Sequence, residues 1–196
     1  MKTCVIYLVR HGESTANRDK LITGHWDVPL TELGRQQAAE TRELLKAVHF
    51  DAVYSSDLER AVQTGTIIHG QPIPPERQLF DLREVSYGKF QGQPKKLIAL
   101  SGLDAESSGE VESLPAMTER FMRALKLIAE SHMGETVLVA AHSGPIRAIL
   151  VELGFAPRED LPHDSFKNSG YVELVYDGRG FKVKKVVGIK KPAEMS

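Results

Sequence analysis

Short apolar runs alternate along this chain with longer amphipathic stretches. The runs Cys4–Val9, Ala52–Ser55 and Thr136–Ala141 end at polar residues or follow a turn, as buried strands do. Stretches with helical periodicity follow, from Thr31 to Val48 and over 58–69, 115–132 and 145–153. This alternation predicts an α/β fold with three layers, α/β/α, around a mostly parallel central sheet joined by right-handed crossovers.

Three of the predicted helices have residues suited to a helix start. Thr31, Ser113 and the pair Ser56-Asp57 carry side-chain oxygens that can accept from the free N–H groups of a first turn. The side chains expected to face the core from the first helix are Leu33, Ala38, Thr41, Leu44, Leu45 and Val48. Those of the 115–132 helix are Met117, Phe121, Ala124, Leu125 and Ile128.

The remaining segments are loops, a hairpin and a short helix. Residues 14–29 are polar without a clear period and predict a long loop, with Trp26 packed into the core. Residues 94–100 predict a short helix, and 171–176 and 181–187 predict a hairpin around Asp177-Gly178. Residues 101–113 are rich in Gly, Ser and acidic side chains. We expect one domain over 1–196, with a lid or insertion at about 86–114.

Composition narrows the classes of function. The net charge is -1 at pH 7, so no overall basic field favours binding to nucleic acid. The apolar runs are too short to cross a membrane, and the N-terminus lacks a signal-peptide pattern, which favours a cytoplasmic location. The single cysteine, Cys4, lies in the first predicted strand, so we expect a buried thiol and no internal disulfide.

Polar side chains follow each predicted parallel strand. Arg10 and His11 follow the first, Arg60 begins the helix after the second, Glu84 follows a short extended piece, and His142 follows the 136–141 strand. The carboxyl ends of parallel strands share one edge of a sheet, which is where ligands bind in open α/β folds. We therefore expect these five side chains to converge.

This set of side chains suits a phosphate monoester. Arg10, Arg60 and His142 can surround a dianion, and the start of the helix after His142 favours an anion. His11 can attack phosphorus and form a phosphohistidine. Glu84 can protonate the leaving alkoxide and then activate water. Each residue alone is more often structural, so the prediction depends on all five occurring at strand ends.

Several motifs then resemble a known family, the histidine phosphatase or phosphoglycerate mutase-like superfamily. They cover nearly the whole chain in the family's order. They are 8–14 (LVRHGES) with Asn17, 27–34 (DVPLTELG), 55–64 (SSDLERAVQT), 82–84 (LRE) with Tyr87-Gly88 and Gln91-Gly92, and 142–147 (HSGPIR). The resemblance implies a phosphoglycerate mutase-like fold and an enzyme of the small phosphatase branch.

The resemblance also implies roles for single residues. His11 would be the phosphorylated nucleophile, Glu84 the proton donor, and Arg10, Arg60 and His142 the phosphate pocket. No metal and no cofactor would be needed, and the sequence agrees, since it has no cluster of Asp, Glu and His at the spacing of metal ligands. The partner would be a small phosphorylated metabolite. The expected substrate-binding residues are Asn17, Thr23, Gly24, Tyr87, Lys95 and Ser143.

Two activities share this pocket, and the sequence favours the phosphatase. The 87–92 loop followed by Lys95 is similar to the mutases, in which the phosphoryl group returns to another hydroxyl. Val85, where glycolytic mutases have Arg, and the short acidic 101–113 segment are similar to the small phosphatases.

A domain that binds phosphorylated ligands without turnover needs neither His11 nor Glu84. A protein phosphohistidine phosphatase would need a more open pocket. A homodimer paired along a sheet edge is compatible with the sequence, and the substrate is left open.

Overall fold

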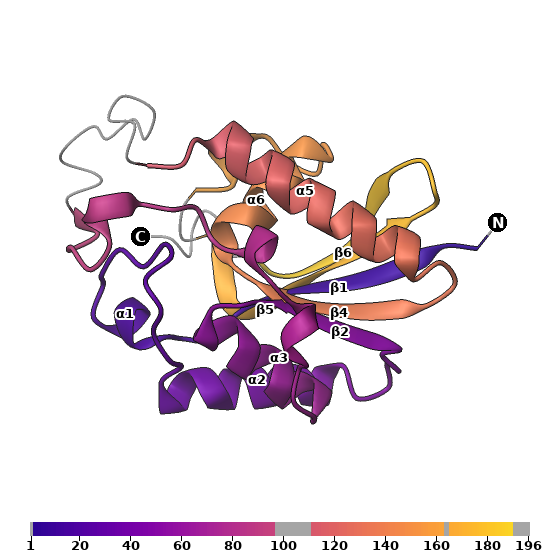
Figure 1. Ribbon diagram of the computed structural model, residues 1–196, viewed down its shortest axis with the longest axis horizontal. Helices are drawn as coiled ribbons and strands as arrows, with labels where there is room; N and C mark the ends of the chain where they lie inside the picture. The colour runs from indigo at the N-terminus through magenta and orange to yellow at the C-terminus, as the bar shows by residue number, and fades with distance from the viewer. Residues whose placement is uncertain (1, 97–110, 163–164, 190–196) are drawn as a thin grey trace.

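The computed structural model describes residues 2–96, 111–162 and 165–189 (Figure 1). The strands are β1 (Cys4–Arg10), β2 (Ala52–Ser56), β3 (Gln78–Leu79), β4 (Thr136–Ala141), β5 (Phe166–Tyr176) and β6 (Phe181–Ile189). The α-helices in these ranges are α1 (Thr15–Arg18), α2 (Glu32–Leu44), α3 (Glu59–His69), α5 (Leu114–Ser131) and α6 (Ser143–Glu152). Short 3-10 turns are η1 (Pro75–Arg77), η2 (Phe80–Leu82), η3 (Gly88–Phe90) and η4 (Arg158–Asp160).

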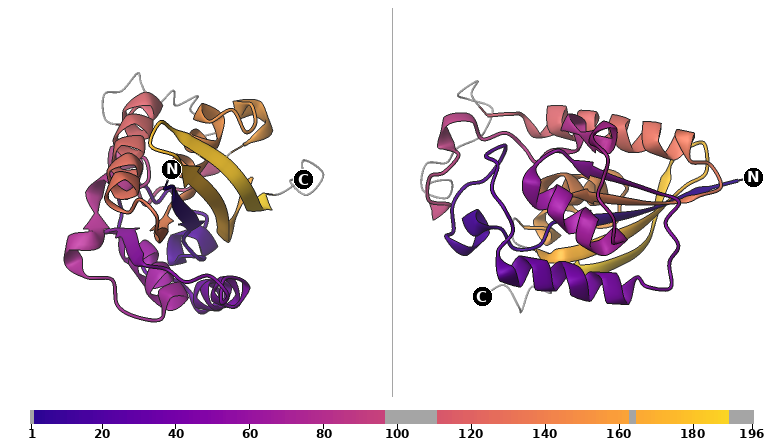
Figure 2. Two further views of the ribbon diagram at one scale, coloured as in Figure 1. Left: turned by 90° about the vertical axis from the view of Figure 1, so that its right-hand side faces the viewer. Right: turned by 60° about the horizontal axis from the view of Figure 1, so that its bottom comes forward.

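The six described strands form one sheet in the order β3-β2-β4-β1-β5-β6. β1, β2, β3 and β4 pair in parallel, while β5 pairs antiparallel to both β1 and β6. Helices α5 and α6 cover one face and α2 and α3 cover the other (Figures 1 and 2). The predicted three-layer α/β fold is therefore confirmed.

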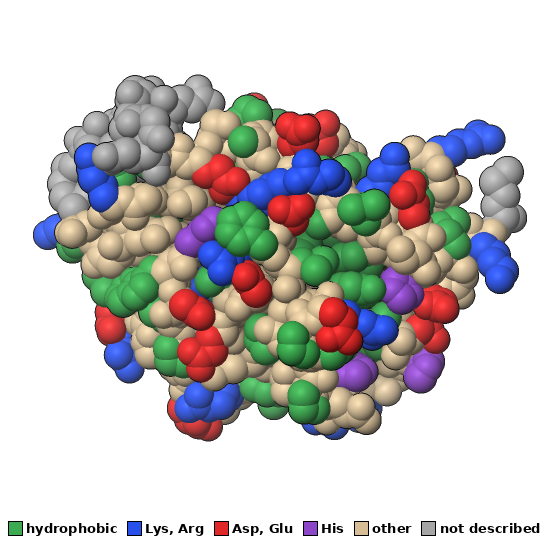
Figure 3. Space-filling model, in the orientation of Figure 1, with side chains coloured by type: hydrophobic (Ala, Val, Ile, Leu, Met, Phe, Trp, Pro, Cys, Tyr) green, Lys and Arg blue, Asp and Glu red, His purple; other side chains and the backbone are tan. Residues whose placement is uncertain are grey.

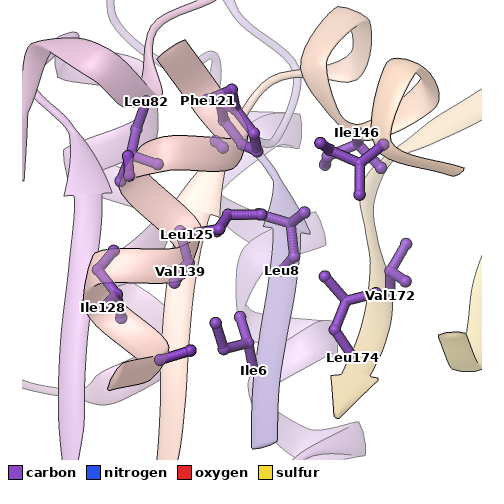
Figure 4. Close-up of a cluster of buried hydrophobic side chains, with 14 of the residues drawn as sticks. Ile6, Leu8, Leu82, Phe121, Leu125, Ile128, Val139, Ile146, Val172 and Leu174 are labelled. Atoms are coloured by element: carbon purple, nitrogen blue, oxygen red, sulfur yellow. The ribbon is translucent and has the colours of Figure 1, made fainter. Parts of the chain in front are cut away.

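Side-chain alternation along β1 explains why both faces are covered. Ile6 and Leu8 point to one face, where they pack with Phe121 and Leu125 of α5 and with α6 (Figure 4). Val9 points to the other face and packs with residues of α2 and α3. A central strand buried on both faces must be apolar throughout, which is the pattern seen in the sequence. Arg10, at the end of β1, is thereby placed at the edge of the sheet.

The helix starts at Thr31 and Ser113 are confirmed. The Thr31 hydroxyl accepts from the Gly34 N–H, and the Ser113 hydroxyl accepts from the Ala116 N–H. The apolar face predicted for α5 is also confirmed, since all five of its side chains are buried. The hairpin is present but longer than predicted, because β5 begins at Phe166 and β6 continues to Ile189.

Other local predictions were wrong. The 14–29 loop contains the short helix α1, and α6 begins at Ser143 rather than at Pro145. In α2 the buried positions are Gly34, Ala38 and Thr41, while Leu33 and Leu44 are exposed. Because Gly34 has no side chain, this face of α2 lies close to the backbone of residues 12–13. The bulkier Leu33 and Leu44 lie on the exposed side of the helix.

The start of α3 and the position of Trp26 also differ from the prediction. Of the predicted pair, Ser56 accepts from the Leu58 N–H at 3.3 Å, whereas Asp57 forms an ion pair with Arg83. The side chain that accepts from the Glu59 N–H is Asp27, from a distant loop, at 2.7 Å. Trp26 is 40% exposed, since its loop is held through backbone carbonyls rather than by burial of the indole. Residues 97–110, with about half of the predicted lid and part of the 94–100 helix, lie outside the described residues.

Candidate active site

The sheet brings together the five side chains that follow its parallel strands. Arg10 ends β1 and His11 follows it, His142 follows β4, Arg60 lies in the first turn of α3, and Glu84 follows η2. All five are buried. The imidazole rings of His11 and His142 lie 5.2 Å apart, centroid to centroid. The predicted convergence is therefore present in the structure.

His11 is held in a defined orientation and tautomer. Its Nδ1 lies 2.6 Å from the carbonyl oxygen of Gly12, and a carbonyl can only accept, so Nδ1 carries the proton. In the neutral ring Nε2 then has a free lone pair. Burial, with the positive charges of Arg60 and Arg10, holds the pKa of His11 well below its ordinary value. A neutral imidazole with an unprotonated Nε2 is a nucleophile.

The backbone of His11 is fixed from two neighbouring strands. Its N–H donates to the Ala141 carbonyl of β4 at 2.9 Å. Its carbonyl oxygen accepts from the Asn168 side chain at 3.1 Å and from the Ser169 N–H at 3.3 Å. Gly12 also lies too close to Gly34 for a side chain, because a β-carbon on Gly12 would be 2.2 Å from the Gly34 carbonyl oxygen.

Two arginines place positive charge beside His11. The Nη1 and Nη2 groups of Arg60 donate to the carbonyls of Trp26 and Gly24, at 3.0 and 2.7 Å. Burial lowers the pKa of Arg60 to about 10, so the guanidinium stays charged at neutral pH. Arg10 donates through Nη1 to the Phe166 carbonyl, which ties it to the start of β5.

His142 and Arg60 retain unsatisfied hydrogen-bonding atoms in the buried site. Both ring nitrogens of His142 and the Nε of Arg60 have no hydrogen-bond partner among the described residues. Burial, then the charge of Arg60, lowers the pKa of His142 well below its ordinary value. Buried polar groups are nearly always satisfied, so these atoms indicate a place for a polar ligand. The N-terminus of α6, directly after His142, favours an anion there.

Glu84 faces the same helix terminus. Its Oε2 accepts from the Gly144 N–H at 3.1 Å, and its Oε1 accepts from the Val85 N–H at 3.0 Å. The contact requires glycine at position 144, since a β-carbon there would lie 2.1 Å from Oε1 of Glu84. The carboxyl group is thereby held at the α6 terminus, at the second residue after His142.

The predicted substrate-binding residues lie around these five in different ways. Asn17 makes a capping box with Ser14, and its Oδ1 also accepts from Asn168, which binds the His11 carbonyl. Gly24, at φ 51°, gives its carbonyl to Arg60. The contact seen for Thr23 is made by its backbone carbonyl, which accepts from the Trp26 N–H at 2.9 Å.

The other three predicted substrate-binding residues are Tyr87, Lys95 and Ser143. The ammonium charge of Lys95 is the last of several contributions to the lowered pKa of His11. Burial, and then the charge of Glu84, raises the pKa of Tyr87, so its phenol stays protonated. Ser143 is the buried first residue of α6.

Sequence reasoning missed three residues that contact this machinery. Arg120 of α5 and His25 each donate to the backbone carbonyl of Glu84, at 2.7 and 2.8 Å. Asn168 binds the His11 carbonyl. The acceptors are main-chain carbonyls, and since every residue has one, the sequence does not show which carbonyl a side chain will bind. The only available signal was Arg120, a charged residue on a helix turn that otherwise faces the core.

The described residues contain no group of three or more His, Cys, Asp or Glu arranged to hold a metal ion. In the same ranges no helix has the length and apolar character needed to cross a membrane. On the face shown in Figure 3, acidic and basic side chains are interspersed.

Comparisons with known proteins agree with this fold. The model of the histidine phosphatase superfamily, branch 1, matches residues 6–188. A metal-independent phosphoserine phosphatase of Arabidopsis thaliana is 38% identical over 161 residues, covering 76% of this chain and 68% of that protein. A 2,3-bisphosphoglycerate-dependent phosphoglycerate mutase of Gloeobacter violaceus is 36% identical over 173 residues, covering 80% and 78%. The solved structure of Bacillus stearothermophilus YhfR superposes with a TM-score of 0.83 at 28% identity, covering 96% and 98%.

This chain therefore belongs to the histidine phosphatase superfamily, whose members are phosphatases or mutases. The two named activities occur among relatives of nearly equal identity, so similarity alone does not choose between them.

Proposed function

We propose that this protein is a metal-independent phosphatase that hydrolyses a small phosphomonoester through a phosphohistidine at His11. The observation that carries the proposal is the tautomer of His11. The Nδ1–H is committed to the Gly12 carbonyl at 2.6 Å, and the lone pair of Nε2 is available in a buried site flanked by Arg60 and Arg10.

The first step transfers the phosphoryl group to His11. The lone pair of Nε2 forms a bond to phosphorus while the bond from phosphorus to the ester oxygen breaks. Arg10, Arg60 and His142 stabilise the phosphoryl oxygens, and the positive end of the α6 dipole favours their negative charge. Glu84, as a carboxylic acid, gives its proton to the departing alkoxide. The alcohol leaves, and Glu84 is then a carboxylate.

The second step restores the enzyme. A water oxygen attacks phosphorus as the bond between phosphorus and Nε2 breaks, and the Glu84 carboxylate takes the proton from that water. Inorganic phosphate leaves, and both residues are back in their starting states. In this scheme only groups of this chain and water take part.

Two features of the sequence, at Val85 and in the 101–113 segment, favour the phosphatase over a mutase. A mutase must hold a second anionic group of its substrate while the phosphoryl group waits on the histidine. Val85 follows Glu84 in place of an arginine, and the 101–113 segment is short and acidic. The similarity to a phosphoglycerate mutase at 36% identity keeps that activity as the alternative.

A substrate panel with a matched control tests the proposal. Phosphoserine, 3-phosphoglycerate and p-nitrophenyl phosphate are incubated with protein in the presence of a chelator. His11→Ala is compared with His49→Ala, whose side chain is 88% exposed. We expect release of inorganic phosphate that persists in the chelator and in His49→Ala and falls by about 10³-fold or more in His11→Ala.

Two results would change the proposal. Interconversion of 3- and 2-phosphoglycerate without release of phosphate would make the protein a mutase. Phosphate release that survives in His11→Ala would contradict the phosphohistidine mechanism.

A further inference from the structure

Arg120, on α5, is a buried cation whose donors are directed at the segment that carries Glu84. Its Nη1 donates to the carbonyls of Asp81 and Arg83, both at 2.9 Å, and its Nη2 donates to the carbonyl of Glu84 at 2.7 Å. A planar guanidinium that binds three carbonyls of one short segment fixes the path of that backbone. The side chain of Arg120 is 9% exposed, so these bonds are largely shielded from water.

Glu112 compensates the charge of Arg120 and extends the network. Its carboxylate accepts from the Nε and Nη2 of Arg120 at 2.6 and 2.8 Å. It also accepts from the Ser86 N–H at 3.1 Å, and its own N–H donates to the Ser86 carbonyl at 2.9 Å. Burial opposes ionisation of Glu112, but the bonds from Arg120 and Ser86 hold its pKa below the ordinary value. The backbone is thus held on both sides of Glu84.

A second donor meets Arg120 at the same oxygen. His25 lies in the 14–29 loop, and its Nε2–H donates to the Glu84 carbonyl at 2.8 Å. The carboxyl group of Glu84 then contacts the α6 terminus through the Gly144 N–H at 3.1 Å. With its carbonyl held by two side chains and its carboxyl held by α6, Glu84 has little freedom to move relative to His11 and His142.

We infer that Arg120, paired with Glu112, is a positioning residue for the proton transfer made by Glu84. The inference depends on the proposed function, in which Glu84 protonates the leaving group. Arg120 contacts no reacting atom. It acts by keeping the Glu84 backbone where the carboxyl group reaches the ester oxygen, and a displacement of about 1 Å is enough to lower such a step by about 10²-fold.

The alternative is that Arg120 only fastens α5 to the rest of the fold. The two roles differ in their dependence on the leaving group. An alkyl phosphate leaves as a strongly basic alkoxide that needs a proton, whereas p-nitrophenyl phosphate leaves as a stable phenolate that does not. A misplaced acid therefore slows the alkyl ester far more, while a general loss of structure slows both esters alike.

The experiment compares kcat/KM for an alkyl phosphate, such as phosphoserine, with kcat/KM for p-nitrophenyl phosphate. This constant covers the steps up to departure of the leaving group, so it excludes hydrolysis of the phosphohistidine. The variants are Arg120→Met and, as matched control, Arg123→Met on the same helix. Arg123 pairs with the Asp81 carboxylate at 3.0 Å and is 58% exposed. Glu84→Gln, which lacks the acid, provides the reference.

We expect Arg120→Met to lower kcat/KM for the alkyl ester by about 30- to 100-fold and for p-nitrophenyl phosphate by less than about 3-fold. Arg123→Met should leave both constants unchanged, and Glu84→Gln should show the same selectivity as Arg120→Met in stronger form. Glu112→Gln is a milder change that keeps the side-chain shape. It should shift the two esters in the same direction by about 3- to 10-fold, and it supplies the test if Arg120→Met does not fold.

Suppose that Glu84→Gln lowers kcat/KM for the alkyl ester selectively, but Arg120→Met or Glu112→Gln lowers it equally for the two esters. That result would overturn the positioning role and leave the proposed mechanism intact. Unchanged constants in a folded Arg120→Met would do the same. An unselective Glu84→Gln would instead remove Glu84 as the acid, and the proposed mechanism would fail together with this inference.

Discussion

The imidazole rings of His11 and His142 meet edge to face, with centroids 5.2 Å apart, in a site that also holds Arg60 and Arg10. Two imidazolium cations at this distance, beside two guanidinium groups, would repel strongly. Burial, and then the charge of Arg60, lowers the pKa of both histidines. The pocket therefore presents neutral imidazoles to an incoming anion.

A first prediction concerns the protonation state of His11. Because its pKa is lowered, the neutral Nδ1–H tautomer should persist at about pH 6, where a histidine in a model peptide, with a pKa near 6.5, is mostly protonated. NMR of the ring nitrogens should show this state in the protein without substrate. Protonation of His11 at or above about pH 6.5 would contradict it.

A second prediction links His142 to stability. Its folded-state pKa lies below its unfolded-state pKa, so its contribution is fully present above about pH 6.5 and is lost as the pH falls toward the folded-state pKa. In His142→Asn the free energy of unfolding should fall less steeply with decreasing pH, by up to about 1.4 kcal/mol per pH unit. Urea titrations from about pH 7 to 5 would measure both slopes, and equal slopes would disprove the prediction.

A third prediction concerns Gly144. Alanine is the better helix former, but its β-carbon would be 2.1 Å from Oε1 of Glu84 and would displace the carboxyl group. Gly144→Ala should therefore lower kcat/KM for an alkyl phosphate by about 10²-fold while changing stability little. Gly180→Ala is the control, because an added β-carbon at Gly180 would meet no neighbouring atom within 4 Å, and it should leave activity unchanged. Full activity in Gly144→Ala would show that the contact is unimportant.

A fourth prediction concerns the contact between α2 and the loop after β1. A β-carbon on Gly34 would lie 2.0 Å from the Glu13 carbonyl oxygen, which is backbone and cannot move easily. Gly34→Ala should destabilise the protein by about 1–3 kcal/mol, although helix propensity alone would favour alanine by about 1 kcal/mol. Gln36→Ala, exposed on the same helix, should stay within about 0.5 kcal/mol of wild type. A stabilised Gly34→Ala would contradict the close approach.

The parts of the fold that could be predicted are those set by local periodicity. The buried face of α5, including Phe121 and Leu125, follows a clear helical repeat, and β1 and β4 are apolar because both of their faces are covered. The convergence of His11, Glu84 and His142 followed from the rule that parallel strands end at one edge. These inferences need only nearby residues and one general rule of topology.

The errors arose where a distant partner decides the outcome. Asp57 suits the start of α3, but Arg83 binds it in a bidentate ion pair and Asp27 caps the helix instead. Leu33 is exposed because Gly34 makes the close contact. Arg120 and His25 were missed because they bind a main-chain carbonyl, and no pattern of side chains shows which carbonyl lacks a partner.

The most direct test of the central claim is to identify the phosphorylated atom. Protein mixed with a turned-over phosphomonoester is quenched at alkaline pH, where phosphohistidine survives, and is analysed by peptide mass mapping and by ³¹P NMR. Because Nδ1 of His11 donates to Gly12, we predict a phosphoryl group on Nε2 of His11, formed as fast as turnover. Phosphate on Nδ1, on His142 or on no histidine during turnover would contradict the account.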